Sequence, residues 1–156
     1  MKLKIFFLAM LPVLLISGCA RQAPVIRRIS RDTSDLEARI VLTDSAYALG
    51  SPIGFTMVVR NAGEDSVELL FANTCTVDFE IARDRYTIWR ATDGENCLQV
   101  LSSAVLGPGD FRSFTATWDG VTADEKGVTL GDYEVRGILL SSSPVITDWA
   151  RFYLVD

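Results

Sequence analysis

Apolar and polar residues alternate along most of the chain from residue 37 onward, with the period of two that is typical of β-strands. The clearest alternating runs are 37–43, 53–60, 76–82 and 149–155. Turn-forming residues separate these runs, and no segment shows a convincing helical period. The pattern therefore predicts an all-β fold of about eight or nine short strands, arranged as an antiparallel β-sandwich with Greek-key connections. A small β-barrel is the alternative.

Neighbouring runs are expected to pair as hairpins. Residues 53–60 and 67–71 are joined by a segment rich in turn-forming residues, which predicts a first hairpin. Residues 76–82 and 86–91 are joined by Arg-Asp-Arg and form a second expected hairpin. A less regular run, 97–105, leads toward the next strand.

The most informative motifs lie between residues 106 and 135. In the sequence Leu-Gly-Pro-Gly-Asp, Pro108 presets its own φ and Gly109 tolerates a positive φ, so we expect a tight turn. The strand that follows alternates and ends at Trp118. Gly131 stands two residues before Tyr133 at the start of another alternating run, a spacing typical of the tyrosine corner of immunoglobulin-like sandwiches. The Tyr133 hydroxyl is then expected to bond to backbone upstream of it.

The N-terminal region has the features of an exported lipoprotein. Residues 1–18 combine two lysines, a short apolar run and small residues, which predicts a signal peptide. The ending Ile-Ser-Gly-Cys resembles the bacterial lipobox, so we expect cleavage before Cys19 and acylation of its thiol. Residues 19–35 are expected to form the lipidated N-terminus and a flexible tether, and residues 36–156 the folded domain. The predicted location is the bacterial cell envelope. The outer membrane, on its periplasmic side, is favoured in a cell with two membranes, because no aspartate follows Cys19.

Two cysteines remain once Cys19 carries lipid. Cys75 and Cys97 flank the predicted hairpin 76–91, in a chain that is expected to enter an oxidising compartment. They predict a disulfide, which would stabilise the fold by about 3 kcal/mol. Two unpaired buried thiols, or a reactive thiol, are the alternatives, and the absence of a Cys-x-x-Cys motif and of histidine argues against the second.

Composition excludes several function classes. The chain has no histidine, which rules out Ser-His-Asp and Cys-His nucleophile systems and histidine-containing metal sites. Its formal net charge of −5 argues against nucleic-acid binding. We considered a calcium site at Asp119, Asp124 and Glu125, but the spacing matches no EF-hand loop. No metal, cofactor or small-molecule substrate is therefore expected.

Six short motifs follow one another within residues 37–140. They are Met57-Val58-Val59-Arg60-Asn61, Val77-Asp78-Phe79, Ile88-Trp89-Arg90, Leu106-Gly107-Pro108-Gly109-Asp110, Thr117-Trp118-Asp119 and Gly131-Asp132-Tyr133. In this order and spacing they resemble the intracellular proteinase inhibitor (BsuPI-like) family, a small immunoglobulin-like β domain. The resemblance implies inhibition of a serine protease. The chain departs from the family pattern at two positions. The family has proline where this chain has Leu130, and the family has an aromatic residue near the position of Cys97.

Together these observations predict a membrane-anchored, non-enzymatic, protein-binding lipoprotein, whose most specific form is an inhibitor of an envelope serine protease. An inhibitor needs an exposed, rigid loop, and two segments are candidates for contact with the partner. They are Asp93, Gly94, Glu95 and Asn96, and Asp124, Glu125 and Lys126.

Two other function classes remain as alternatives. A structural or assembly subunit of an envelope complex would use exposed aromatic residues, for which Trp89 and Trp149 are candidates if they are not in the core. An enzyme with a glycosidase-like pair of carboxylates could use Asp78 and Glu80. Alternation places these two acids on the outward face of a strand, where acids are ordinarily just solvated.

Overall fold

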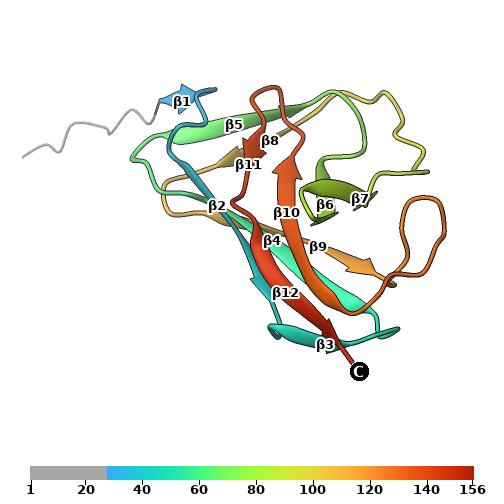
Figure 1. The fold of residues 1–156 in the computed structure, drawn as a ribbon. Helices are drawn as coiled ribbons and strands as arrows, with labels where there is room; N and C mark the ends of the chain where they lie inside the picture. The colour runs from blue at the N-terminus through green and yellow to red at the C-terminus, as the bar shows by residue number, and fades with distance from the viewer. Residues whose placement is uncertain (1–27) are drawn as a thin grey trace, which may run out of the picture.

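The computed structural model describes residues 28–156, which form twelve β-strands and no helix (Figure 1). The predicted signal peptide and the predicted lipidation site, Cys19, lie outside the described residues. The strands form two main sheets and a small third sheet. Within residues 28–156, no helix could span a membrane.

The first main sheet has three strands, β2 (Leu36–Leu42), β4 (Ile53–Asn61) and β9 (Phe111–Trp118). The middle strand, β4, is antiparallel to both neighbours. Its alternate residues, such as Phe55 and Met57, are buried because they face the second sheet. The alternation predicted for this strand is therefore confirmed.

The second main sheet has the order β3–β12–β10–β6–β7, with β11 pairing to β10 beside this path. The chain crosses between the two main sheets from β4 to β6 and from β9 to β10. This alternation between sheets makes the fold an immunoglobulin-like β-sandwich with Greek-key connections, as predicted. The strands are β3 (Ala46–Ala48), β6 (Val77–Arg83), β7 (Tyr86–Arg90), β10 (Gly131–Leu139), β11 (Val145–Ile146) and β12 (Ala150–Val155).

The third sheet contains β1 (Ile29–Ser30), β5 (Ser66–Phe71) and β8 (Ser102–Leu106). The predicted hairpin between 53–60 and 67–71 is wrong, because β5 pairs with β8 and β1 and not with β4. Both edges of β4 are already occupied by β2 and β9. In addition, the Asn61 side-chain amide donates hydrogen bonds to the carbonyls of Asp65 and Leu106, which directs the chain after β4 toward β8.

The segment before β2 is attached to the domain, which corrects the prediction of a flexible tether as far as residue 35. Ile29 and Ser30 pair in parallel with the start of β5, and the Ser66 N–H donates to the Arg28 carbonyl over 3.0 Å. Arg31 also forms an ion pair with Glu68 over 3.1 Å. The free backbone edge of β5 explains this attachment, because it offers hydrogen-bonding groups that the N-terminal segment can satisfy.

Aromatic side chains form the centre of the core between the main sheets. Trp118, Tyr133 and Phe152 lie with their ring centroids 5.7 to 6.1 Å apart, and all three are buried. The Tyr133 hydroxyl donates a hydrogen bond of 2.7 Å to the Thr129 carbonyl, upstream of it, and accepts one of 2.7 Å from Arg83. The backbone bond expected for a tyrosine corner is therefore present.

The predicted turn before β9 is also present. Gly109 has a φ of 78°, and the Asp110 N–H donates to the Gly107 carbonyl over 3.0 Å. Pro108 occupies the preceding position of this turn, where its fixed φ fits. Gly131, at the start of β10, has a φ of 131°, a value that favours glycine.

Candidate binding loop

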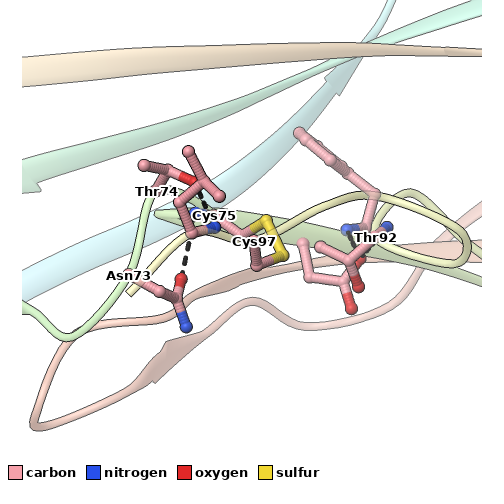
Figure 2. Close-up of a disulfide and its surroundings, with 8 residues drawn as sticks. Asn73, Thr74, Cys75, Thr92 and Cys97 are labelled. Carbon is pink, nitrogen blue, oxygen red and sulfur yellow. Dashed lines mark hydrogen bonds between the residues drawn. A yellow bond between two sulfur atoms is a disulfide. The ribbon is translucent and has the colours of Figure 1, made fainter. Parts of the chain in front are cut away.

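A disulfide connects Cys75, just before β6, with Cys97, in the loop between β7 and β8 (Figure 2). Their Cα atoms are 5.3 Å apart, and 22 positions separate them in sequence. The predicted pairing is confirmed. We call residues 91–101, which join β7 to β8, the braced loop, because the disulfide and the hydrogen bonds described next attach it to the sandwich.

Hydrogen bonds continue the attachment on both sides of the disulfide. The Thr74 N–H donates to the Leu98 carbonyl over 2.9 Å, and the Leu98 N–H donates to Thr74 Oγ1 over 3.0 Å. Asn73 Oδ1 accepts from the Cys75 N–H over 2.9 Å, which orients the other half of the bridge (Figure 2). The loop is thereby fixed through both its covalent bridge and the backbone that follows it.

The beginning of the braced loop is held by β6. The Ala91 N–H donates to the Phe79 carbonyl over 2.9 Å, and the Thr92 N–H donates to Asp78 Oδ1 over 3.1 Å. Asp78 also lies 3.6 Å from the Arg90 guanidinium. This carboxylate therefore acts as an anchor for the first turn of the loop.

The outward, solvated position predicted for Asp78 and Glu80 is wrong, since these residues are only 3% and 1% exposed. Arginines from both neighbouring strands cover them. Glu80 forms ion pairs with Arg90 on β7 and with Arg136 on β10, whose Nε donates to Glu80 Oε2 over 2.7 Å. The ring of Trp149 covers Arg136 in turn, with the guanidinium 4.5 Å from the ring centroid. Burial of the acids is possible because their oxygens have charged or backbone donors.

The far end of the braced loop exposes three apolar side chains. Leu98, Val100 and Leu101 are 55%, 52% and 85% exposed. Only residues 99–101 separate the attached Leu98 from Ser102, which begins β8 and pairs with Phe71. The braced loop thus exposes a short apolar segment, and the chain is fixed to the sandwich at both ends of this segment.

Sequence reasoning missed this apolar segment. Residues 97–105 form a less regular run in the sequence, and the boundary within this run was not predicted. In the structure β8 begins at Ser102, and residues 97–101 belong to the loop. One signal could have identified the apolar segment, namely the sequence Leu-Gln-Val-Leu directly after Cys97. A disulfide just after a hairpin fixes the loop that follows it, so apolar residues at that position belong to a fixed loop.

The first predicted partner segment lies in the braced loop. Asp93, Gly94, Glu95 and Asn96 are all exposed and form the tight turn before Cys97. Gly94 has a φ of 80°, which glycine accommodates without strain. Asp93 and Glu95 line a hollow of about 370 Å³ that also includes Asp119 on the loop after β9.

The second predicted partner segment, Asp124, Glu125 and Lys126, lies in the loop between β9 and β10. An ion pair with Lys126 and a hydrogen bond from Thr122 lower the pKa of the Asp124 carboxyl. The same ion pair raises the pKa of Lys126. The Ala123 N–H attaches this loop to the Ile88 carbonyl of β7 over 2.8 Å. No large apolar side chain is exposed in the segment 121–127.

The two candidate tryptophans occupy different environments. Trp89 is partly buried and packs against the core, with its ring 6.3 Å from that of Phe55. Trp149 is 37% exposed and stacks on Arg136. Within residues 28–156, no group of three acidic or cysteine side chains is placed to hold a metal ion, and this includes the calcium site considered at Asp119.

Comparison with known families identifies this sandwich. A family model described as intracellular proteinase inhibitor, BsuPI, matches residues 40–144. The chain belongs to the BsuPI family. The BsuPI match includes both disulfide cysteines and the whole braced loop. No curated protein sequence matches the chain.

Solved structures that match this BsuPI domain are distant. The sporulation control protein Spo0M from Bacillus subtilis is 18% identical, with a TM-score of 0.48 over 78% of this chain and 50% of Spo0M. The β-glucosidase EmGH1 from Erythrobacter marinus is 17% identical, with a TM-score of 0.46 over 77% of this chain and 15% of the glucosidase. The CARDB domain of PF1109 from Pyrococcus furiosus is 12% identical, with a TM-score of 0.42 over 78% and 93%. At these scores the matches carry no argument about function.

Proposed function

We propose that this protein is a non-enzymatic, protein-binding lipoprotein that inhibits a proteinase through its braced loop. Membership of the proteinase inhibitor family supports the class of partner. The observation that carries the proposal is the exposure of Leu98, Val100 and Leu101 on a loop that is fixed by a disulfide. Exposed apolar side chains at such a position are typical of protein contact sites.

Rigidity favours the braced loop over a free segment as an inhibitory element. A loop that is ordered before binding loses little conformational entropy when it enters a partner's cleft. Here the disulfide, the two hydrogen bonds between Thr74 and Leu98 and the Asp78 anchor at Thr92 provide that order. The loop between β9 and β10 lacks a comparable apolar anchor among its central residues.

The proposed location is the cell envelope, where the chain is anchored through lipid on Cys19. A disulfide is favoured in an oxidising compartment, which agrees with export. Because residues 28–35 are attached to the domain, only the nine residues 19–27 would separate the lipid from the folded part. Such a segment reaches at most about 32 Å, so the domain would act on partners close to the membrane surface.

Affinity capture of the tagged, full-length protein from detergent-solubilised membranes, followed by mass spectrometry and an inhibition assay, tests the partner. Recovery of one enriched proteinase, which the purified protein then inhibits, would support the proposal. Recovery of envelope lipoproteins or barrel proteins in fixed ratio, with no proteinase inhibited, would overturn it. That second result would favour the alternative role as an assembly subunit, for which the exposed ring of Trp149 offers a contact.

The anchor is tested separately by labelling cells with radioactive palmitate. The wild-type protein should take up label and fractionate with membranes, whereas Cys19→Ala should do neither. A Cys75→Ser variant provides the matched control, because Cys75 forms the disulfide and is not expected to carry lipid. Equal labelling of the wild type and Cys19→Ala would contradict lipidation at this residue.

A further inference from the structure

We infer that Leu101 is the anchor residue of the inhibitory contact and that the partner proteinase has an apolar specificity pocket. This inference rests on the proposed function and specifies the substrate preference of the partner. Leu101 is 85% exposed, more than any other large apolar side chain in residues 28–156. When such a side chain enters an apolar pocket of the proteinase, its apolar surface is removed from water. This burial of one residue contributes favourably to the binding free energy.

The backbone around Leu101 distinguishes it from the other apolar residues of the braced loop. Leu98 is tied through both its N–H and its carbonyl to Thr74, and its carbonyl also accepts from the Val100 N–H over 2.9 Å. The bonds to Thr74 attach Leu98 to the segment before β6, and Val100 is attached to Leu98 in turn. Leu101 follows them as the last residue before β8, and its side chain is the most exposed of the three.

The strand that follows Leu101 can pair with a proteinase. Proteins commonly bind an extended segment by adding it to a sheet through main-chain hydrogen bonds. In the described residues β8 pairs only with β5, so it is an edge strand of its sheet. Ser102 and Ser103, which come directly after Leu101, are exposed on this edge strand. The segment around Leu101 therefore offers both a side chain for a pocket and backbone for pairing.

Apolar surface next to Leu101 extends the contact. Leu101 lines a hollow of about 280 Å³ together with Leu70, Phe71 and Leu140. This surface combines residues of β5 with the segment that follows β10. A proteinase that places Leu101 in its pocket would cover this hollow with the rim of its cleft, which would remove further apolar area from water.

The same geometry explains how the loop could resist cleavage. Hydrolysis of the peptide bond between Leu101 and Ser102 would consume one water molecule and create a carboxylate on Leu101 and an amine on Ser102. Both new ends would remain in place, because the disulfide at Cys97 holds the first and pairing with Phe71 holds the second. Slow departure of the ends keeps a cut loop in the cleft, so the complex is expected to outlast many turnovers of a normal substrate.

The test uses full-length protein extracted in detergent, with chymotrypsin and trypsin as probes of apolar and cationic pockets. The wild type should inhibit chymotrypsin, and Leu101→Arg should lose about 100-fold in that inhibition and gain inhibition of trypsin. Phe111→Arg is the matched control, because Phe111 is an apolar residue 66% exposed at the start of β9, outside the braced loop. Prolonged incubation with chymotrypsin should cut the wild type slowly after Leu101, as mass spectrometry would show.

The outcomes separate this inference from the proposed function. If Leu101→Arg inhibits chymotrypsin as well as the wild type does, the anchor assignment is overturned while inhibition itself stands. If the wild type inhibits neither probe nor any proteinase captured from membranes, both are overturned. Equal unfolding midpoints of the wild type and Leu101→Arg in urea would show that a loss of inhibition does not arise from misfolding, as expected for so exposed a side chain.

Discussion

Replacement of Glu80 by glutamine tests whether the buried ion pairs stabilise the sandwich around the braced loop. Glu80 is 1% exposed in the middle of β6. Arg136 Nε donates to its Oε2 over 2.7 Å, a second guanidinium nitrogen of Arg136 lies 2.6 Å from the same oxygen, and Arg90 pairs with its Oε1. Glu80→Gln keeps the shape of the side chain but removes the charge and replaces one acceptor oxygen by an NH₂ group that faces an arginine.

The expected cost follows from what the arginines lose. Removing one partner of a buried ion pair typically costs about 3 to 5 kcal/mol, because the remaining charge stays buried. The side chains of Arg90 and Arg136 are 44% and 30% exposed, so water can solvate them in part after the substitution. We therefore expect the lower end of that range, about 3 kcal/mol. For a domain of this size, the loss corresponds to a decrease in Tm of about 10 °C.

Urea unfolding followed by tryptophan fluorescence and circular dichroism measures this cost. The matched control is Glu134→Gln, which makes the same chemical change on the adjacent strand β10. Glu134 pairs with Arg151 over 2.9 Å, but the Arg151 side chain is 77% exposed. That exposed pair is expected to contribute less than about 0.5 kcal/mol. The difference between the two variants therefore isolates the effect of burial.

One result would refute the reasoning. The reasoning is refuted if Glu80→Gln and Glu134→Gln lower the free energy of unfolding equally, with unchanged m-values. The buried ion pairs of Glu80 would then contribute no more stability than the exposed pair of Glu134. A further comparison checks the mechanism, because Arg136→Gln should cost a similar amount to Glu80→Gln if the loss comes from the pair itself. A double variant should then cost clearly less than the sum of the two single changes.

Three further predictions concern the loop and its framework. Replacing Cys75 and Cys97 together by serine should lower the free energy of unfolding by about 3 kcal/mol and weaken proteinase inhibition. Identical urea unfolding curves of the wild type and this double variant would contradict the prediction. Tyr133→Phe should cost about 1 to 2 kcal/mol in the same assay, because the Thr129 carbonyl loses its donor, and a neutral effect would show that water replaces it. Arg85→Gly should instead stabilise the domain by about 0.5 kcal/mol, since Arg85 has a φ of 70°, and a lower Tm would contradict the strain argument.

Several parts of this structure could be predicted because they depend on local pattern. The period-two alternation located β4, β9 and β10, and the Gly131-x-Tyr133 spacing indicated a tyrosine whose hydroxyl bonds to upstream backbone. The Cys75–Cys97 bridge was predictable for a similar reason, because both cysteines lie beside the base of one hairpin. In each case residues close in sequence determine the geometry.

Other features were decided only by the tertiary structure. Alternation shows which residues of β6 share a face, but the burial of Asp78 and Glu80 depends on the arginines of the two strands that pair with β6. Similarly, β5 resembles a hairpin partner of β4 until both edges of β4 are seen to be occupied. The sequence likewise does not show where the loop of residues 97–101 ends, because the start of β8 at Ser102 depends on its pairing with β5. A sequence pattern reports the faces of a strand, whereas its partners, and hence what covers each face, depend on contacts between distant parts of the chain.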